Sequence, residues 1–379
     1  MTNEKKDSFH FPAAGLIALF VIGLWGCLLI YAAGAMGSSS GFYAWKQMVW
    51  LAAGCLSFAV SAAIPFPALL RWRNILFRLV LAALILVLIF GQRIRGMSGW
   101  FAFGTVLLQP SEFAKPVFLL LLAAASGDRS AVGEGRRFLH QILIAGAFCL
   151  LILAEPDFGS AALFYLGLLM ILWLQGTSPR FLLPAILAAP AGAGIFLYFK
   201  PYAFDRILAF LNPGSTLYRG TWHIRQFQYA LAEGGWMGSE HGAPLWSNAY
   251  LPLPHTDSIF ASIVETSGLL GGLIVLLSFS AASFGMVFLA RRERLIPEAA
   301  LYVEGVAFLY LAQALLHISV NVVLLPPTGV TLPLLSYGGS SLCSTMIALG
   351  TAFSAFRSGR QSSTEKISGD QQPSPETLE

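Results

Sequence analysis

The stretch LPLPHTDSIF, residues 251–260, marks the boundary on which the architecture of this chain depends. It ends the one long polar segment of the sequence, about residues 200–257, and leads into an apolar run that continues to about residue 289. A helix of about 20 apolar residues is enough to cross a lipid bilayer. The stretch therefore predicts the point at which a long loop meets the membrane again.

The composition of the whole chain agrees with this interpretation. Of its 379 residues, 56% are hydrophobic and only 11% are charged, whereas soluble domains carry about 25% charged residues. This predicts an all-α polytopic membrane protein. The net charge of +4 is too small to indicate a nucleic-acid partner, and the four cysteines lie in apolar runs, where they behave as small hydrophobic residues.

Hydropathy predicts about ten membrane-spanning helices. The expected spans lie near residues 13–36, 44–66, 75–91, 113–127, 139–154, 159–176, 182–199, 258–289, 300–323 and 333–353. The first run is too long for the core of a signal peptide, so we count it as a span. We expect residues 1–12 and a disordered tail at 357–379 to flank a membrane domain at 13–356, with a long loop at 200–257 between the seventh and eighth spans.

Basic residues gather in the loops on one side of this arrangement. That side holds Arg71, Arg73, Arg129, Arg136, Arg137, Arg180, Arg291, Arg292 and Arg294, and the tail adds Arg357, Arg360 and Lys366. Cytoplasmic loops are enriched in Lys and Arg. We therefore expect both termini in the cytoplasm and the loop at 200–257 on the outer side.

Asp257 is the candidate catalytic residue. It lies where the outer loop meets the eighth span, so its carboxylate is partly removed from water, which increases its basicity. This favours a general base that acts on a lipid-linked substrate at the membrane surface. The alternative is a carboxylate that caps the following helix, since Asp is common at that position.

Charged residues inside the predicted spans are the next candidates. In QPSEFAK, residues 109–115, Glu112 and Lys115 are three positions apart and share a helix face, so they can pair. Such a pair either stabilises packing or contacts substrate. In EPDFGS, residues 155–160, the simpler interpretation is a tight outer turn.

Two further segments carry polar candidates. The outer loop mixes aromatic residues with Arg206 and Gln226, which suits amphipathic segments at the membrane interface. The tenth span begins TLPLLSYGGSS, residues 331–341, where glycines next to Ser336 and Ser340 either expose backbone N–H groups to an anionic headgroup or allow close helix packing. Spacing alone favours packing.

Taken together, these stretches resemble the SEDS family of shape, elongation, division and sporulation proteins. The segment TLPLLSYGGSS is slightly more similar to the FtsW branch of the family than to its RodA branch. The resemblance extends from the second span to the tenth. Its motifs are QPSEFAK at 109–115, EPDFGSA at 155–161, FDRILAFLNP at 204–213, WHIRQFQYALAEGGWMG at 222–238, HTDSIFASIVETSGLLG at 255–271 and LLPPTGVTLPLLSYGGSS at 324–341.

The resemblance implies a ten-helix fold in a bacterial cytoplasmic membrane and a glycosyltransferase that polymerises lipid II into peptidoglycan strands. It implies partnership with a class B penicillin-binding protein in a division or elongation complex, and undecaprenyl-pyrophosphate-linked glycan as the growing chain. It assigns the catalytic role to Asp257. The substrate contacts that we predict are Glu112, Lys115, Arg206, Gln226, His255, Thr256, Glu265, Ser336 and Ser340.

The chain also departs from the family pattern. Ala249 and Leu253 stand where acidic residues are usual, Gly99 replaces an Arg, Glu155 replaces a Gln and His317 replaces an Asn. The lost acids weaken any site for a divalent cation (Mg²⁺ or Mn²⁺), so no cofactor is certain and we predict no metal ligands. They also make a non-catalytic scaffold that regulates a penicillin-binding protein a credible alternative. A lipid II flippase, with the charged residues of the fourth and fifth spans as its pathway, is the other alternative, and Asp257 in the outer loop argues against it.

Overall fold

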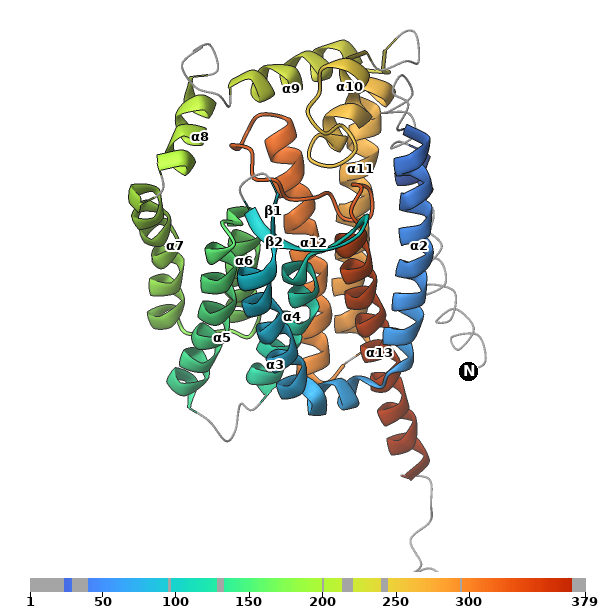
Figure 1. Ribbon diagram of the computed structural model, residues 1–379. Coiled ribbons are helices and arrows are strands. Elements are labelled where there is room, and N and C mark those ends of the chain that lie inside the picture. The colour runs from blue at the N-terminus through green and yellow to red at the C-terminus, as the bar shows by residue number, and fades with distance from the viewer. Residues whose placement is uncertain are drawn as a thin grey trace, which may run out of the picture.

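The computed structural model describes residues 24–28, 40–94, 97–127, 133–199, 201–212, 221–239, 245–293 and 295–369. Long helices stand side by side and form a bundle whose two ends carry different elements (Figure 1). One end carries a small sheet and three shorter helices, and the other end carries the connections α2–α3 and α11–α12.

Nine long helices build the described part of the bundle. They are α2 (Ser40–Ala63), α3 (Phe66–Phe90), α4 (Pro110–Gly127), α5 (Glu134–Ala154), α6 (Phe158–Leu174), α7 (Pro179–Phe199), α11 (Ile259–Arg292), α12 (Pro297–Asn321) and α13 (Gly339–Gly369). Within the described residues, six of these (α2, α3, α5, α11, α12 and α13) are long and apolar enough to cross a membrane, and α6 is a shorter apolar helix.

The predicted spans and the helices differ mainly at their ends. The predicted span at 44–66 runs past Pro65, but α2 ends at Ala63 and Pro65 is the N-cap of α3, because proline lacks the N–H that a helix interior needs. α3 therefore begins at Phe66 and includes polar residues that we had placed in a loop. The first predicted span, 13–36, lies outside the described residues apart from 24–28.

The tenth predicted span, 333–353, begins too early. Residues 330–338 form an irregular segment, and α13 begins at Gly339. Leu334 adopts a φ of 64°, which a helix does not allow, although its side chain is buried. At its other end α13 continues to Gly369, into the segment that the sequence assigns to the tail.

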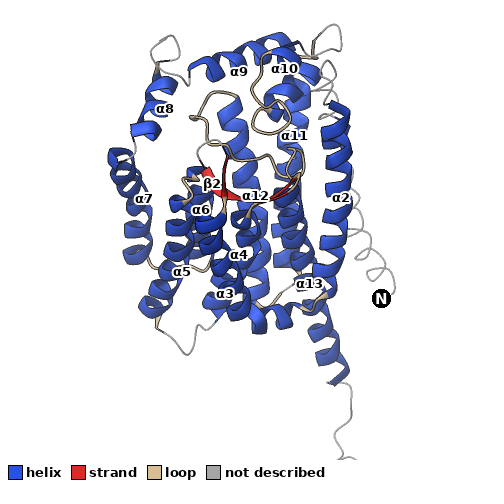
Figure 2. Ribbon diagram, in the orientation of Figure 1, coloured by secondary structure: helices blue, strands red, loops and turns tan. Residues whose placement is uncertain are grey.

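The all-α polytopic prediction is confirmed by the helical bundle, to which a small antiparallel sheet after α3 is the one addition among the described residues. The strands of this sheet, β1 (Gln92–Ile94), β2 (Met97–Phe103) and β3 (Val106–Leu108), pair in the order β1-β2-β3, and Figure 2 shows them among the helices. Phe103 pairs with Val106 across a two-residue turn at Gly104, whose φ of 61° suits such turns. The sheet brings residue 99 to the end of α5.

The predicted outer loop is largely helical. It contains α8 (Pro201–Leu211), α9 (Thr221–Gly234) and α10 (Leu245–Ala249), and α9 lies across the end of the bundle (Figure 1). One face of α9 buries Ile224, Phe227 and Ala230, while Trp222 and Tyr229 on the other face are exposed. The expected amphipathic character is therefore present in α9.

α9 and the turn that follows it pack directly against α11. The backbone of Trp236 approaches Gly268 so closely that a Cβ at Gly268 would lie 2.2 Å from the Trp236 carbonyl oxygen. Gly268 also has a φ of 70° and kinks α11. The N–H groups of Leu269 and Leu270 donate to the carbonyls of Gly235 and Trp236, so the outer helices have a fixed position on the bundle.

α12 is the central helix. It packs against α4, α6, α11 and α13. The core beside it holds an aromatic cluster in which the rings of Phe118, Phe148 and Phe164 lie 4.8–5.5 Å apart. Because α12 ends at Asn321, close to residues 255–261, it connects this core with the candidate site.

Candidate active site

Residues 251–258 form a compact turn between α10 and α11. The carbonyl oxygen of Leu253 accepts hydrogen bonds from the N–H groups of Thr256 at 3.0 Å and Ser258 at 3.3 Å. Leu253 has a φ of 54°, in the left-handed region that side chains other than glycine rarely adopt. The Oγ of Ser258 donates to the carbonyl of Pro252. The turn is therefore held internally, directly before α11.

The three consecutive carbonyls of residues 255–257 are also held from outside the turn. In chain order they accept hydrogen bonds from the N–H of Tyr337 at 2.7 Å, the Oγ of Ser336 at 3.0 Å and the Nδ2 of Asn321 at 3.0 Å. We call these three donors the carbonyl clamp. They come from two separate segments, the end of α12 and the segment before α13, so residues remote in sequence fix the backbone beneath Asp257.

The ring of His255 packs among aromatic side chains. It stacks on Tyr43 of α2 with ring centroids 4.3 Å apart, and it meets the edge of Tyr337 at 5.8 Å. The two tyrosine rings also contact each other at 5.2 Å. The predicted substrate contact His255 thus forms part of the wall that supports the turn.

Asp257 itself is half-buried at the start of α11. The N-cap position of α11 falls on Ser258, one residue later, and Ser258 makes no side-chain cap hydrogen bond in the described structure. The structure therefore does not place Asp257 at the capping position that the alternative interpretation requires. Its neighbour Thr256 has a buried Oγ1 that finds no hydrogen-bond partner among the described residues.

Glu265 is fully buried two turns further along α11. Its carboxylate accepts the backbone N–H groups of Trp246 at 2.6 Å and Ser247 at 2.7 Å, and also the Oγ of Ser247. These N–H groups begin α10, and a helix leaves its first N–H groups without internal partners. Glu265 therefore anchors α10, the element that leads into the turn, and its oxygens are already used within the protein.

Glu112 and Lys115 form the ion pair that their spacing predicts. Lys115 Nζ lies 2.7 Å from Glu112 Oε1 and 3.0 Å from the Oε1 of Gln313 on α12, and Lys115 is only 1% exposed. Gln313 in turn donates to the carbonyl of Thr331 at 2.9 Å. The ammonium is thus enclosed in a network that joins α4, α12 and the segment before α13, and this arrangement favours the packing interpretation.

The remaining predicted contacts separate into two groups. The hydroxyls of Ser336 and Ser340 are used internally: Ser336 belongs to the carbonyl clamp, and Ser340 accepts the N–H of Gln109 at 3.0 Å. Gln226, on the buried face of α9, leaves its Oε1 without a hydrogen-bond partner in the described part of the chain. The side chain of Arg206 in α8 lies outside the described residues.

A second buried carboxylate lies at the turn between α5 and α6. Glu155 is 0% exposed, and neither of its oxygens has a hydrogen-bond partner among the described residues. Its carboxylate lies beside Gly99 of β2, where a Cβ would be 2.6 Å from Glu155 Oε2. Burial, together with the neighbouring carboxylate of Asp157, raises the pKa of Glu155 to about 8. Two departures from the family pattern are therefore in direct contact.

The described residues offer poor support for a bound metal ion. They contain no group of three or more His, Cys, Asp or Glu side chains arranged to hold one. Ala249 and Leu253, on either side of the turn's start, supply no oxygen ligand from their side chains, and hard divalent cations require several such ligands.

Sequence reasoning missed two residues of the site, Asn321 and Tyr43. A signal for Asn321 was present, because Gln313, His317 and Asn321 repeat at every fourth position of an apolar span and thus lie on one helix face. The contact of Tyr43 with His255 joins residues more than 200 positions apart, and the sequence pattern of α2 gave no indication of it.

The chain is similar to known proteins over most of its length. A family model described as a cell cycle protein, FtsW/RodA/SpoVE, matches residues 9–360. Two curated relatives are each named probable peptidoglycan glycosyltransferase FtsW. The protein of Alcanivorax borkumensis is 31% identical over 86% of this chain and 90% of its own length. That of Thiomicrospira cyclica is 34% identical over 81% of this chain and 80% of its own.

Solved structures show the same fold. A chain from a peptidoglycan synthase complex, described as coordinating polymerization and crosslinking, aligns with a TM-score of 0.77 and 26% identity over 92% of this chain and 98% of that chain. The rod shape determining protein RodA of Thermus thermophilus aligns with a TM-score of 0.67 and 24% identity over 91% of this chain and 96% of that one.

Proposed function

The chain belongs to the FtsW/RodA/SpoVE family and is a multi-pass membrane protein and a peptidoglycan glycosyltransferase, and we propose that it polymerises lipid II with Asp257 as the general base. The observation that carries the proposal is the position of Asp257. Its carboxylate is half-buried on a turn whose backbone is fixed by the carbonyl clamp, at the end of the bundle that α9 covers.

The proposed reaction needs one base. Asp257 removes the proton from a sugar hydroxyl of the acceptor, and the hydroxyl oxygen attacks the anomeric carbon of the donor. The bond between that carbon and the pyrophosphate oxygen breaks, and the lipid pyrophosphate leaves with the bonding electrons. A single displacement inverts the anomeric carbon, so an α-linked donor yields a β-linked strand. A second carboxylate acting as nucleophile is not required, in contrast to a retaining glycosidase.

The surroundings of Asp257 suit a polar substrate. Thr256, the neighbour of Asp257, has a buried Oγ1 without a partner among the described residues, as does the Oε1 of Gln226 on α9, and buried polar atoms are normally hydrogen-bonded. A sugar hydroxyl is a group that can satisfy the Thr256 hydroxyl. By contrast, Glu112, Lys115, Glu265, Ser336 and Ser340 have internal partners, so we assign them to the support of the site.

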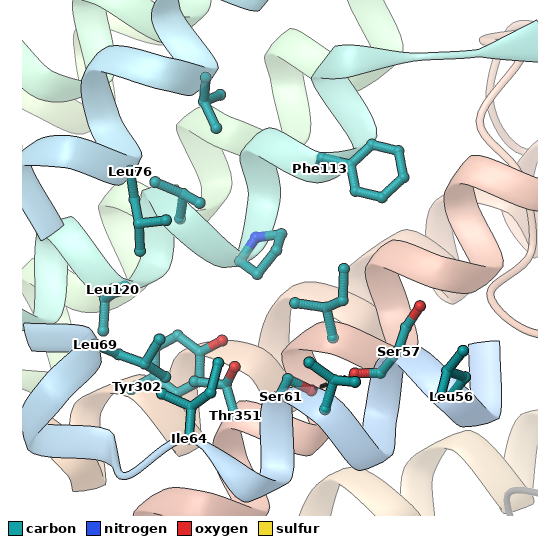
Figure 3. A pocket seen from close by; sticks show the side chains of 15 residues that line it. Leu56, Ser57, Ser61, Ile64, Leu69, Leu76, Phe113, Leu120, Tyr302 and Thr351 are labelled. Carbon is teal, nitrogen blue, oxygen red and sulfur yellow. Dashed lines mark hydrogen bonds between the residues drawn. The ribbon is translucent and has the colours of Figure 1, made fainter. Parts of the chain in front are cut away.

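A lipid-linked substrate also needs room for its chain. A cavity of about 520 Å³ lies between α2, α3 and α4, with side chains of α12 and α13 at its base. Figure 3 shows apolar side chains such as Leu56, Leu76, Phe113 and Leu120 around this hollow, with the hydroxyls of Ser57 and Ser61 at one side. Because the side chains that line this cavity are mostly apolar, we propose the isoprenoid chain of the substrate as its occupant.

The charge distribution supports a location in the cytoplasmic membrane with both termini in the cytoplasm. Arginines occupy the second turn of α3, the first turns of α5 and α7 and the last turn of α11, at the end of the bundle opposite to the sheet and α9. The positive-inside rule places this end in the cytoplasm. Asp257 is then on the outer side, where peptidoglycan is assembled.

The similarity to a chain of a peptidoglycan synthase complex supports a partner that cross-links the new strands. We propose that this partner is a class B penicillin-binding protein in a division or elongation complex. Purification of the chain with such a protein, followed by measurement of polymerisation with and without it, tests this assignment.

Substitution of Asp257 tests the general base. Asp257→Asn keeps the size of the side chain and removes its basicity, so polymerisation should fall by about 10²- to 10⁴-fold. The assay is gel separation of glycan strands formed from lipid II by the purified protein. Glu293→Gln is the matched control, because it removes a carboxylate from the opposite end of α11, and it should retain wild-type activity. Undiminished polymerisation by Asp257→Asn would overturn the mechanism.

A further inference from the structure

Asn321 makes three hydrogen bonds from a fully buried position at the end of α12. Its Nδ2 donates to the carbonyls of Asp257 and His317, each at 3.0 Å, and its Oδ1 accepts the N–H of Ala261 at 3.1 Å. The side-chain amide therefore connects the last turn of α12 with the backbone on both sides of the start of α11.

The contact with Ala261 acts as a helix cap that comes from another helix. The first N–H groups of a helix have no internal partners and are usually satisfied by the N-cap side chain. Ser258 occupies the N-cap of α11, but its Oγ donates to Pro252 and makes no cap bond in the described structure. The amide oxygen of Asn321 satisfies one of the N–H groups that Ser258 leaves.

The contact with Asp257 is the member of the carbonyl clamp nearest to the carboxylate. Tyr337 and Ser336 hold the carbonyls of His255 and Thr256, which precede Asp257. Asn321 holds the Asp257 carbonyl itself, and through the N–H of Ala261 it fixes the backbone on the far side as well. A peptide plane held in this way determines the direction of the Cα–Cβ bond.

The support of Asn321 is itself rigid. Gln313 and His317 lie two turns and one turn before it on α12, and both are buried. Gln313 binds Lys115 and Thr331, and His317 Nδ1 lies 2.7 Å from the carbonyl oxygen of Val330. Catalytic groups require supporting residues that hold them within about 0.5 Å of the productive position.

We propose that Asn321 is a positioning residue of the polymerase, which directs the carboxylate of Asp257 toward the acceptor hydroxyl through its bonds to Asp257 and Ala261. This inference rests on the proposed role of Asp257 as general base. Asn321 does not touch the substrate in this role. Its loss should therefore reduce kcat and leave KM nearly unchanged.

Two variants of Asn321 separate positioning from stability. Asn321→Leu has a similar size and removes all three hydrogen bonds. Asn321→Asp keeps an acceptor for the Ala261 N–H, where the helix N-terminus favours negative charge, but it loses the donor to the Asp257 carbonyl. We expect both to lower kcat by roughly 10- to 100-fold, as small misplacements of catalytic groups do, with KM changed less than about twofold.

Gln141→Leu is the control for a lost buried amide. Gln141 on α5 is also 0% exposed, and its Nε2 donates to Ser126 Oγ at 2.9 Å and Gln175 Oε1 at 3.0 Å, near the opposite end of the bundle. Its loss should lower the unfolding temperature and leave kcat per folded molecule at the wild-type value. The assay is polymerisation of lipid II at several concentrations, normalised to the folded fraction.

The activity of Asp257→Asn, measured in parallel, distinguishes failure of the positioning role of Asn321 from failure of the general-base role of Asp257. If Asp257→Asn is inactive while both Asn321 variants keep wild-type kcat per folded molecule, the positioning role is wrong and the general base stands. If Asp257→Asn is fully active, the general base is wrong and the positioning role fails with it. Equal losses of kcat in Gln141→Leu and Asn321→Leu would also overturn the inference, because any lost buried amide would then have the same effect.

Discussion

Glu112 and Glu155 are two buried carboxylates that the protein stabilises in opposite ways. Glu112 is 6% exposed, and its Oε1 lies 2.7 Å from Lys115 Nζ. Glu155 is 0% exposed, and neither oxygen has a partner among the described residues. The two regions are neighbours, since Gln109, just before α4, donates from Nε2 to Asp157, two residues after Glu155.

The comparison shows that burial alone does not determine whether a carboxylate is protonated. Beside Glu112 the ammonium of Lys115 supplies a counter-charge that offsets part of the hydration lost on burial. A buried carboxylate without a counter-charge takes up a proton instead, because the neutral acid costs less to bury. An Arg at position 99, which the resemblance leads us to expect, would place a positive charge near Glu155, whereas Gly99 has no side chain.

The largest expected effect on stability comes from removing the counter-charge of Glu112, which leaves this carboxylate without a partner, as Glu155 is among the described residues. Lys115→Met removes the ammonium and leaves the Glu112 carboxylate buried without its counter-charge, which should destabilise the protein by about 3–5 kcal/mol. Unfolding of the purified variant in detergent measures this loss. A variant as stable as the wild type would show that the pair does not stabilise the fold.

The double variant Glu112→Gln with Lys115→Met sharpens the result. It removes both charges, so most of the stability should return, as expected for two groups that act as a pair. Recovery of polymerisation together with stability would assign the pair to packing. Recovery of stability without activity would instead show that the reaction needs the charge of Lys115.

The next expected effect is a dependence of protein stability on pH that is caused by Glu155. Its pKa is raised from 4.5 to about 8 in the folded protein, so between these values the folded state holds a proton that the unfolded state has lost. Stability therefore decreases as the pH rises from about 4.5 to about 8, by up to about 1.4 kcal/mol per pH unit. Above pH 8 this contribution no longer changes.

Glu155→Gln removes the titrating group and keeps its shape. The variant should lose this decrease and be more stable than the wild type at pH 8, as judged by unfolding temperatures measured between pH 5 and pH 9. Glu293→Gln, at the opposite end of the bundle, should keep the wild-type slope. Equal slopes in the wild type and Glu155→Gln would mean that Glu155 is not protonated in the folded protein.

The sequence predicted those features that depend on local pattern. Apolar length predicted the helices of the bundle, and the spacing of three predicted the pair of Glu112 with Lys115, which the structure confirms. Aromatic and polar alternation predicted the amphipathic character found in α9. Each of these follows from neighbours within one or two turns of the chain.

Features that depend on distant partners were not predictable in this way. Ser336 was assigned to substrate, but its hydroxyl bonds to the carbonyl of Thr256, 80 residues away. The strands β1 and β3 have only three residues each, too few to show an alternating pattern. Nothing in the sequence indicates that Gly99 and Glu155 are neighbours, because the sheet brings the two residues together from positions 56 apart.

The smallest expected effect tests that contact between Gly99 and Glu155. A Cβ at Gly99 would lie 2.6 Å from Glu155 Oε2, so Gly99→Ala forces the carboxylate to move within a closed space and should cost about 1 kcal/mol of stability. In a Glu155→Ala background the obstructing oxygen is absent, and the same change should cost much less. Gly146→Ala on α5 is the control, since a Cβ there meets nothing within 4 Å. Unfolding of the single and double variants gives the coupling energy between the two sites. An equal cost of Gly99→Ala in both backgrounds would show that glycine at this position does not serve to accommodate the buried acid.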